Sequence, residues 1–246
     1  MKFISHYSSS KGNAYEVVAD SGGRLLVECG VPWAKMEKAL GFRLYGIEGC
    51  LLSHSHADHC RAAKDLTKNV INVYASHETL DAIGITDWHA NILDCIEVGD
   101  ETRYQIRHLD SFDVLPFGVQ HDVPCLGFVI HERATDEYLL FATDFFCLEQ
   151  KFPYPFSIVA LACSYDTDIL QRLVDNQAID ETLAKRLLFS HPSKQWLMDY
   201  LLYYVNRSKC REIYLLHCSA GNLDAEAARL EIETEFMIDT FVHWEV

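Results

Sequence analysis

The sequence has few basic residues and no long apolar run. Its 246 residues include 21 Lys and Arg against 36 Asp and Glu, which gives a formal net charge of −15. This balance excludes a general basic sleeve for nucleic acid, although a local positive site is compatible with it. No apolar run approaches the ~18 residues that span a bilayer, so we expect no membrane segment. The residues MKFISHYSSSKGNAY also lack the apolar stretch of a secretory signal.

Paired cysteines are missing as well. The nine cysteines are an odd number, and no two of them are spaced as CxxC. Free thiols in a reducing compartment explain this pattern better than a disulfide framework does. We therefore expect a cytoplasmic protein.

Glycine and proline are scarce, with 12 and 6 residues, and charged residues make up only 23%. This composition excludes collagen, a coiled coil and a disordered tail. Hydrophobic residues reach 49%, enough for a substantial core. We see no repeat, low-complexity tract or linker that divides the chain, so we expect one domain over residues 1–246.

Short apolar runs bounded by polar turns predict strands. Several runs are apolar almost throughout, which is typical of a sheet covered on both faces. The eight runs are 24–27, 49–52, 70–74, 114–119, 127–130, 138–141, 157–162 and 212–216.

Helical patterns lie between and after these runs. They cover 33–40 after Pro32, 58–68, and an apolar stripe from Trp196 to Val205. A last helix is expected to begin near Asp224, with Ala227, Ala228, Leu230 and Ile232 facing inward. Strands mixed with helices at both ends favour layered sheets with helices outside.

One segment carries most of the chemistry: His54-Ser55-His56-Ala57-Asp58-His59, directly after the run 49–52. Two His at i and i+2 at a strand end converge on one ion if the chain leaves its pleat in a turn. Asp58 and His59, at the start of the next helix, then face a second ion. Imidazoles with a few carboxylates suit Zn²⁺, Mn²⁺ or Fe. A His-rich surface turn is the alternative explanation.

Three further residues of types that bind metal ions lie just past the ends of predicted strands. His121 follows 114–119, Asp144 follows 138–141, and His217 follows 212–216. Open α/β architectures build their sites at such strand ends. Taken singly, each residue fits a loop His or a helix-capping Asp equally well, but the shared position favours ligands.

These motifs resemble a known family. HSHADH matches the HxHxDH signature of the metallo-β-lactamase fold, and Asp144 and His217 match its later metal motifs. The resemblance extends to about residue 235 and implies an α/β fold, the four-layer αββα sandwich of the metallo-β-lactamase type. The chain looks closest to the single-domain YycJ (WalJ)-type branch, whose members are described as DNA exonucleases. The matching stretches are SSSKGNAY at 8–15, LLVECG at 25–30, LPFGVQHDVPCLGFVI at 115–130, LLFATD at 139–144, SHPSK at 190–194 and LLHCS at 215–219.

The resemblance implies two divalent transition-metal ions, Zn or Mn, in a dinuclear site. It places one ion on His54, His56 and His121, a second on Asp58, His59 and His217, and Asp144 between them. The acid that orients ligands from behind in this family is usually Asp in the LL-D-CG stretch. In this chain it is Glu28, so either the longer side chain reaches the same partner by a different route or the local geometry differs.

Two ions about 3.5–4 Å apart share a bridging water and lower its pKa, which yields a hydroxide nucleophile near neutral pH. Asp58 is expected to accept a proton or to orient the nucleophile. His191 lies where the branch has a His-x-Ser element and is a candidate to protonate the leaving oxygen. A plain loop His is the alternative.

Substrate contacts are expected from two loops. Ser193 and the start of the following helix could hold a phosphate through backbone N–H groups. Ser10 and Asn13 belong to a loop that resembles one near the active site in the branch. A flexible turn explains that loop almost as well.

The leading hypothesis is a metal-dependent phosphodiesterase, a nuclease acting on DNA ends. The alternative is a small-molecule hydrolase, such as a thioesterase, lactonase or cyclic-nucleotide phosphodiesterase, for which an acidic surface is no handicap. A third hypothesis is a non-catalytic, metal-stabilised interaction module. The sequence leaves the oligomeric state open.

Overall fold

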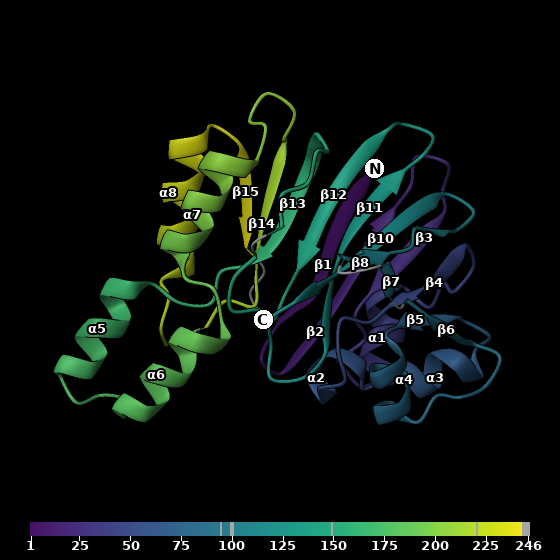
Figure 1. Ribbon diagram of the computed structural model, residues 1–246, viewed down its shortest axis with the longest axis horizontal. Helices are drawn as coiled ribbons and strands as arrows, with labels where there is room; N and C mark the ends of the chain where they lie inside the picture. The colour runs from purple at the N-terminus through teal and green to yellow at the C-terminus, as the bar shows by residue number, and fades with distance from the viewer. Residues whose placement is uncertain (94, 99–100, 149, 220, 243–246) are drawn as a thin grey trace.

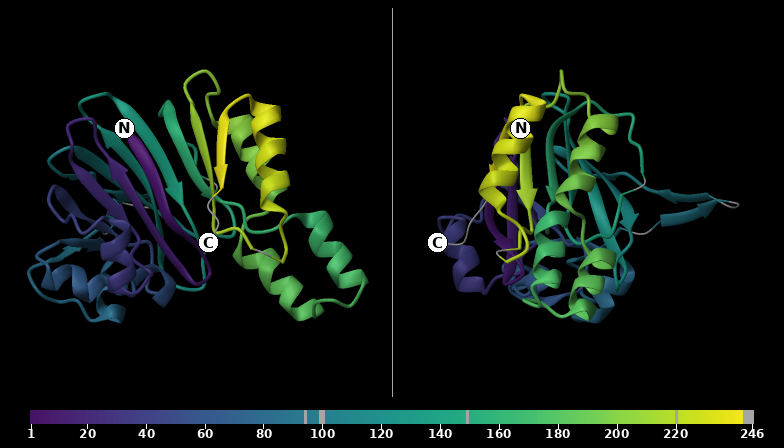
Figure 2. Two further views of the ribbon diagram at one scale, coloured as in Figure 1. Left: turned by 180° about the vertical axis from the view of Figure 1, so that it is seen from behind. Right: turned by 90° about the vertical axis from the view of Figure 1, so that its left-hand side faces the viewer.

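Two β-sheets form the centre of the computed structural model, which describes residues 1–246 except 94, 99–100, 149, 220 and 243–246 (Figure 1). One sheet has the order β1 (Lys2–Ser9), β2 (Gly12–Val18), β3 (Arg24–Val27), β4 (Ile47–Leu51), β5 (Val73–Ala75), β6 (Ala90–Ile92). The other has the order β15 (Asp239–Val242), β14 (Glu212–Leu216), β13 (Phe156–Ala162), β12 (Glu137–Ala142), β11 (Cys125–Glu132), β10 (Phe112–Val119), β9 (Arg107–His108). A separate pair, β7 (Cys95–Val98) and β8 (Glu101–Tyr104), projects from the sheets in the right panel of Figure 2.

Helices cover the outer face of each sheet. The first sheet carries α1 (Trp33–Ala39), α2 (Ala57–Cys60), α3 (Ala63–Lys68) and α4 (His77–Ile83), and the second carries α7 (Lys194–Tyr204) and α8 (Ala225–Phe236) (Figure 1). Between β13 and α7, the chain forms α5 (Thr167–Asp175) and α6 (Glu181–Ser190). The inner faces pack on each other through Phe3, Tyr15, Phe128 and Phe141. The αββα sandwich expected from the sequence is therefore confirmed.

Strand direction brings the candidate ligands to one edge. Strands β3 to β6 are parallel, as are β12 to β15, so their carboxyl ends gather at the same edge of each sheet. β4 ends at Leu51, three residues before His54. β12 ends two residues before Asp144, and β14 ends directly before His217.

The helix expected over 58–68 is divided into α2 and α3. A continuous helix would bond the Ala62 N–H to the carbonyl of Asp58. Instead, the Ala62 N–H donates to the carbonyl of Cys29 at 2.9 Å, and the Asp58 carbonyl accepts from the side chain of Asn13 at 3.2 Å. Contacts from the first sheet thus interrupt the helix just after the metal-ligand motif.

Two further expectations were wrong. The run 70–74 becomes a strand only from Val73, because Val70 lies in a left-handed turn (φ 64°) after α3 and is exposed. In α8, Ala227 and Leu230 face solvent, and the buried residues are Ala225, Ala228, Ile232 and Phe236. No helix in the described part of the chain has the length and apolarity needed to cross a membrane.

Candidate metal centre

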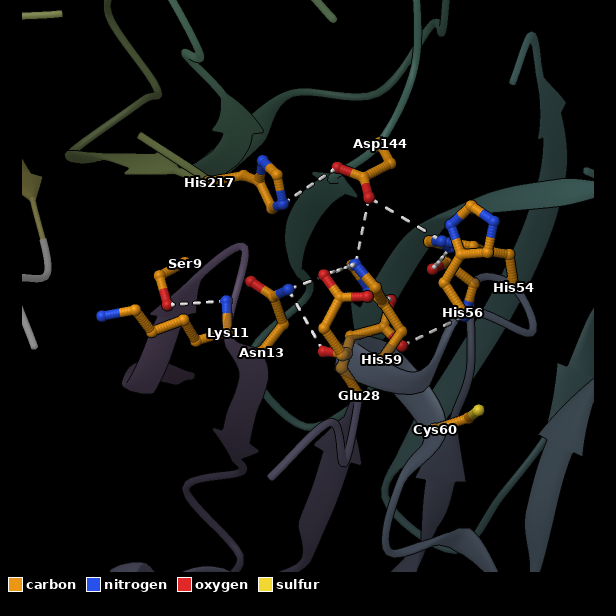
Figure 3. A network of polar contacts seen from close by, with 12 residues as sticks. Ser9, Lys11, Asn13, Glu28, His54, His56, His59, Cys60, Asp144 and His217 are labelled. Atoms are coloured by element: carbon orange, nitrogen blue, oxygen red, sulfur yellow. Dashed lines mark hydrogen bonds and ion pairs between the residues drawn. The ribbon is translucent and has the colours of Figure 1, made fainter. Parts of the chain in front are cut away.

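The seven side chains predicted as ligands come together at the edge where the parallel strands end. Figure 3 shows His54, His56, His59, Asp144 and His217 of this set. They form two groups, in each of which one ligand atom per residue lies within 4.8 Å of the others. The groups are His54, His56, His121, Asp144 and Asp58, His59, Asp144, His217. Asp144 belongs to both groups, as the sequence predicts for a residue between two ions.

The first group contains three imidazoles besides the shared Asp144. The ring centroids of His54 and His56 are 4.6 Å apart, and His121 lies 4.9 Å from His54 and 5.2 Å from His56. The loop between β10 and β11 supplies His121, while the other two rings follow β4. Three rings from two separate segments therefore surround one point.

Asp144 reaches both groups with its carboxylate. Its Oδ2 lies 3.7 Å from His54 Nε2 and 3.0 Å from His59 Nε2, and its Oδ1 lies 3.4 Å from His217 Nε2 (Figure 3). Asp58 Oδ2 is 3.5 Å from His59 Nε2. The single carboxylate of Asp144 is thus shared between the first and second groups.

Buried groups orient the ligand rings from behind. Ser53 Oγ lies 2.8 Å from Nδ1 of His54, which turns the other ring nitrogen toward Asp144. Glu28 Oε1 lies 3.3 Å from Nδ1 of His59 and does the same there. Glu28 is fully buried, so its longer side chain lies behind a candidate ligand, as the resemblance implies for an acid at this position.

Two rings of the first group, His54 and His121, can offer a nitrogen lone pair to a metal ion. Burial lowers the pKa of His54 to about 2, and the neighbouring His59 adds to this effect. Burial also lowers the pKa of His121. Both rings are therefore neutral at pH 7, the form that binds metal.

Asp144 brings negative charge to both groups. Burial acts against the ionised form of Asp144, but His217 and His59 outweigh it and hold the pKa of its carboxyl well below the ordinary value. Burial likewise acts against a charged His59, but Glu28 and Asp144 outweigh it and raise the pKa of the ring. The buried carboxylates of Asp144 and Glu28 thus attract a cation to this point, and a divalent ion meets that demand.

Unsatisfied atoms test whether these residues fit metal ions. His54 Nε2, His217 Nε2 and Asp144 Oδ1 are buried and have no hydrogen-bond partner among the described residues. Buried polar atoms in proteins are nearly always bonded. Three orphaned atoms facing one space, all nitrogen or carboxylate oxygen, fit divalent transition-metal ions.

His191 joins the site from the junction of α6 and α7. Its Nδ1 lies 3.8 Å from Asp144 Oδ1, and its ring stacks on that of His217 with centroids 5.3 Å apart. The side chain is 20% exposed, so it stands between the ligands and solvent. This position is compatible with the proton-donor role predicted for it.

The three predicted substrate contacts are placed differently. Ser193 is the N-cap of α7, and its Oγ accepts from the backbone N–H of Trp196 at 3.0 Å. Ser10 is exposed in the turn between β1 and β2. Asn13 is fully buried beside His59, with its amide nitrogen against His59 Nε2 (Figure 3), which leaves no surface of its amide for a substrate. A substrate contact remains a prediction for Ser10 and Ser193.

Two residues at the site were missed by sequence reasoning. Ser53 precedes the motif and has no pattern of its own. Asp122 Oδ1 lies 2.9 Å from Nε2 of His121 and 3.6 Å from Nε2 of His56. An acid directly after a candidate ligand was the available signal for Asp122.

A family model described as the Metallo-beta-lactamase superfamily matches residues 10–183, more than half of the chain. The chain belongs to the metallo-beta-lactamase superfamily. The matched range contains six of the seven candidate ligands, and His217 lies beyond it. Hydrolases of the metallo-beta-lactamase fold are metal-dependent enzymes, in agreement with the His and Asp groups described above.

Solved structures share the whole fold at low sequence identity. The metallo-beta-lactamase fold protein YhfI from Bacillus subtilis is 16% identical, with a TM-score of 0.68 over 98% of this chain and 95% of that one. Human tRNase Z, short form, is 12% identical (TM-score 0.63, 100% and 97%), and yeast PDE1 is 11% identical (0.62, 99% and 97%). Such identities show the fold alone. A search of curated proteins finds no match.

Proposed function

We propose that this chain is a metal-dependent phosphodiesterase, a nuclease that acts on DNA ends, of the YycJ (WalJ)-type branch. His54, His56 and His121 would hold one divalent ion and Asp58, His59 and His217 a second, with Asp144 shared. Zn and Mn suit this nitrogen and oxygen set. The cytoplasm is the expected location.

The observation that supports phosphodiester cleavage most is the placement of His191. An imidazole beside the shared carboxylate, yet reachable from solvent, would be available to protonate a leaving oxygen. Contact with Asp144 Oδ1 and the His217 ring fixes its orientation. His191 would therefore donate the proton to the leaving oxygen, while ions held by the seven candidate ligands would bind the scissile phosphate.

Asp58 would act on the attacking water rather than on the leaving oxygen. Burial acts against its charge, but the adjacent His59 outweighs burial and lowers the pKa of the Asp58 carboxyl. An ionised carboxylate orients an attacking water and accepts its proton. Bound divalent ions would supply Lewis acidity toward the phosphoryl oxygens.

The net charge of −15 favours a second candidate, a small-molecule hydrolase acting on a thioester, lactone or cyclic nucleotide. Phosphate contacts normally dominate nucleic-acid affinity, and an acidic protein supplies few of them. A nuclease acting on ends needs contact with only a few nucleotides. We accordingly expect modest DNA affinity that depends strongly on metal and salt.

End-labelled single- and double-stranded DNA, incubated with Mn²⁺ or Zn²⁺, tests this function. Wild type should shorten the labelled strands. His191→Gln should retain its metal but cleave DNA about 10²–10⁴-fold more slowly. Asp58→Asn should also be inactive. Unchanged DNA, together with metal-dependent cleavage of a model thioester or lactone by wild type, would contradict the nuclease proposal and favour the second candidate.

A further inference from the structure

A buried chain of hydrogen bonds links two of the candidate ligands through the hairpin of β1 and β2. The backbone N–H of His217 donates to Ser8 Oγ at 3.0 Å, and Ser8 Oγ lies 2.8 Å from the hydroxyl of Tyr15. That hydroxyl donates to Asn13 Oδ1 at 3.0 Å. The Asn13 amide nitrogen donates to the Asp58 carbonyl at 3.2 Å and lies 3.1 Å from His59 Nε2.

The direction of each bond follows from its neighbours. The Asp58 carbonyl can only accept, so the Asn13 amide must turn its nitrogen toward Asp58 and its oxygen toward Tyr15. Tyr15 then gives its one proton to Asn13. Ser8 must therefore donate to Tyr15 and accept from His217. One arrangement satisfies every member of the chain.

Burial makes this arrangement costly to lose. Tyr15 and Asn13 are fully buried, and Ser8 is nearly so. Burial raises the pKa of Tyr15 well above its ordinary value, so the phenol keeps its proton at any physiological pH. Removing one member leaves buried polar groups unpaired on both sides of it.

Each end of this chain of hydrogen bonds binds a backbone group that secondary structure does not satisfy or stabilise. His217 has a left-handed backbone (φ 50°), which is unfavourable for a non-glycine residue, and its N–H is held by Ser8. At the other end, the Asp58 carbonyl is the one that a continuous helix would have used, and Asn13 holds it instead. The hairpin thus joins the backbone of the second sheet's ligand, His217, to the backbone of a ligand of the first sheet, Asp58.

We propose that Tyr15 is a positioning residue for the second metal position, acting through Ser8 on the backbone of His217 and through Asn13 on the backbone of Asp58. The proposal depends on the metal centre and not on the identity of the substrate. The first position has a separate support, because His54 is oriented by Ser53. Loss of the Tyr15 hydroxyl should therefore weaken one ion and spare the other.

Tyr15→Phe tests this selectivity in two backgrounds. His121→Ala disables the first position and leaves the second, and His217→Ala does the reverse. Zn²⁺ affinity is measured by competition with a chromophoric chelator. Tyr15→Phe should weaken Zn²⁺ binding about 10–100-fold in the His121→Ala background, the usual range for groups behind metal ligands. In the His217→Ala background the affinity should stay within about twofold.

Tyr214→Phe is the matched control. Its hydroxyl also makes two hydrogen bonds, to the carbonyl of Phe3 at 3.2 Å and to Glu212 at 2.9 Å, but neither partner belongs to the metal centre. It should leave Zn²⁺ affinity unchanged in both backgrounds. Ser8→Ala breaks the same chain without altering the ring, and it replaces Tyr15→Phe if that variant does not fold.

The outcomes separate this inference from the function proposed above. Equal weakening of both positions by Tyr15→Phe, or weakening of neither, would overturn the role of Tyr15 while wild type still binds two ions. A wild-type protein that binds no ion would overturn the metal centre itself.

Discussion

Glu28 shows what one methylene does at the residue scale. The resembling family usually has Asp at this position, and the longer Glu28 carboxylate still reaches His59 Nδ1 at 3.3 Å. Its backbone is left-handed (φ 62°), and its other oxygen, Oε2, accepts from the Ser53 N–H at 3.4 Å. Glu28 thus contacts the residue that orients His54 as well as His59 itself. The ring-orienting role expected of an acid here is compatible with the longer side chain.

Glu16 offers a titration test away from the metal centre. This buried carboxylate lies 2.5 Å from Arg24 Nε and 2.9 Å from His6 Nε2. Burial alone would raise its pKa, but His6 and Arg24 outweigh burial and hold the pKa below its ordinary value of 4.5. A depressed pKa means that the folded state favours the ionised form. The resulting stability is present above about pH 4.5 and is lost as the pH falls through the folded pKa.

We predict that Glu16→Gln lowers the free energy of unfolding by about 1–3 kcal/mol at pH 7, because a charge-assisted pair is lost. The difference from wild type should shrink as the pH falls below about 4.5, because the unfolded wild type is protonated first and the folded wild type follows at its lower pKa. Urea unfolding of metal-free protein between pH 3 and pH 7 measures both values. A difference that stays constant over this range would contradict the assignment.

The ligand types were predictable at this scale, but their supports were not. A single His or Asp after an apolar run has other uses, but the HxHxDH motif and the shared position past strand ends allowed His54, His121 and Asp144 to be chosen from the sequence. Tyr15 and Ser8 look like ordinary strand residues. Their role depends on which buried groups meet across the hairpin, and that information exists only in three dimensions.

At the scale of elements, tertiary contacts decide where helices end. Local signals placed the start of α8 correctly, since Asp224 caps it by accepting from the Ala227 N–H. The division between α2 and α3 has no local signal, because Cys29 and Asn13 take the backbone groups concerned. β1 and β2 were also missed, since polar residues interrupt their apolar pattern.

A substitution at Gly30 tests how closely the loop after β3 packs on α2. A Cβ at Gly30 would lie 1.6 Å from the Asp58 carbonyl oxygen and 2.6 Å from the His59 nitrogen. Both are backbone atoms, so α2 must shift to make room. We predict that Gly30→Ala destabilises the protein by about 1–3 kcal/mol and reduces its metal content.

Gly221→Ala is the comparison for this substitution. No described atom lies within 4 Å of a Cβ built at Gly221, so its free energy of unfolding should change by less than about 0.5 kcal/mol. Thermal melts and elemental analysis of both variants measure these effects. A Gly30→Ala protein as stable and as metal-rich as Gly221→Ala would show that α2 tolerates displacement.

At the scale of the whole molecule, the two sheets each contribute part of the site. The first sheet carries His54, His56, Asp58 and His59, and the second carries His121, Asp144 and His217. Packing of the inner faces through aromatic side chains holds the two sets in register. Binding of ions across this boundary should stabilise the folded state by mass action.

Metal content measured by elemental analysis is the most direct test of the metal centre. Protein saturated with Zn²⁺ or Mn²⁺ and then desalted should carry two ions per chain. His121→Ala and His217→Ala should each carry about one, because each removes a ligand from one group only. A wild-type chain without bound ions, or variants with undiminished content, would contradict the assignment of these seven side chains.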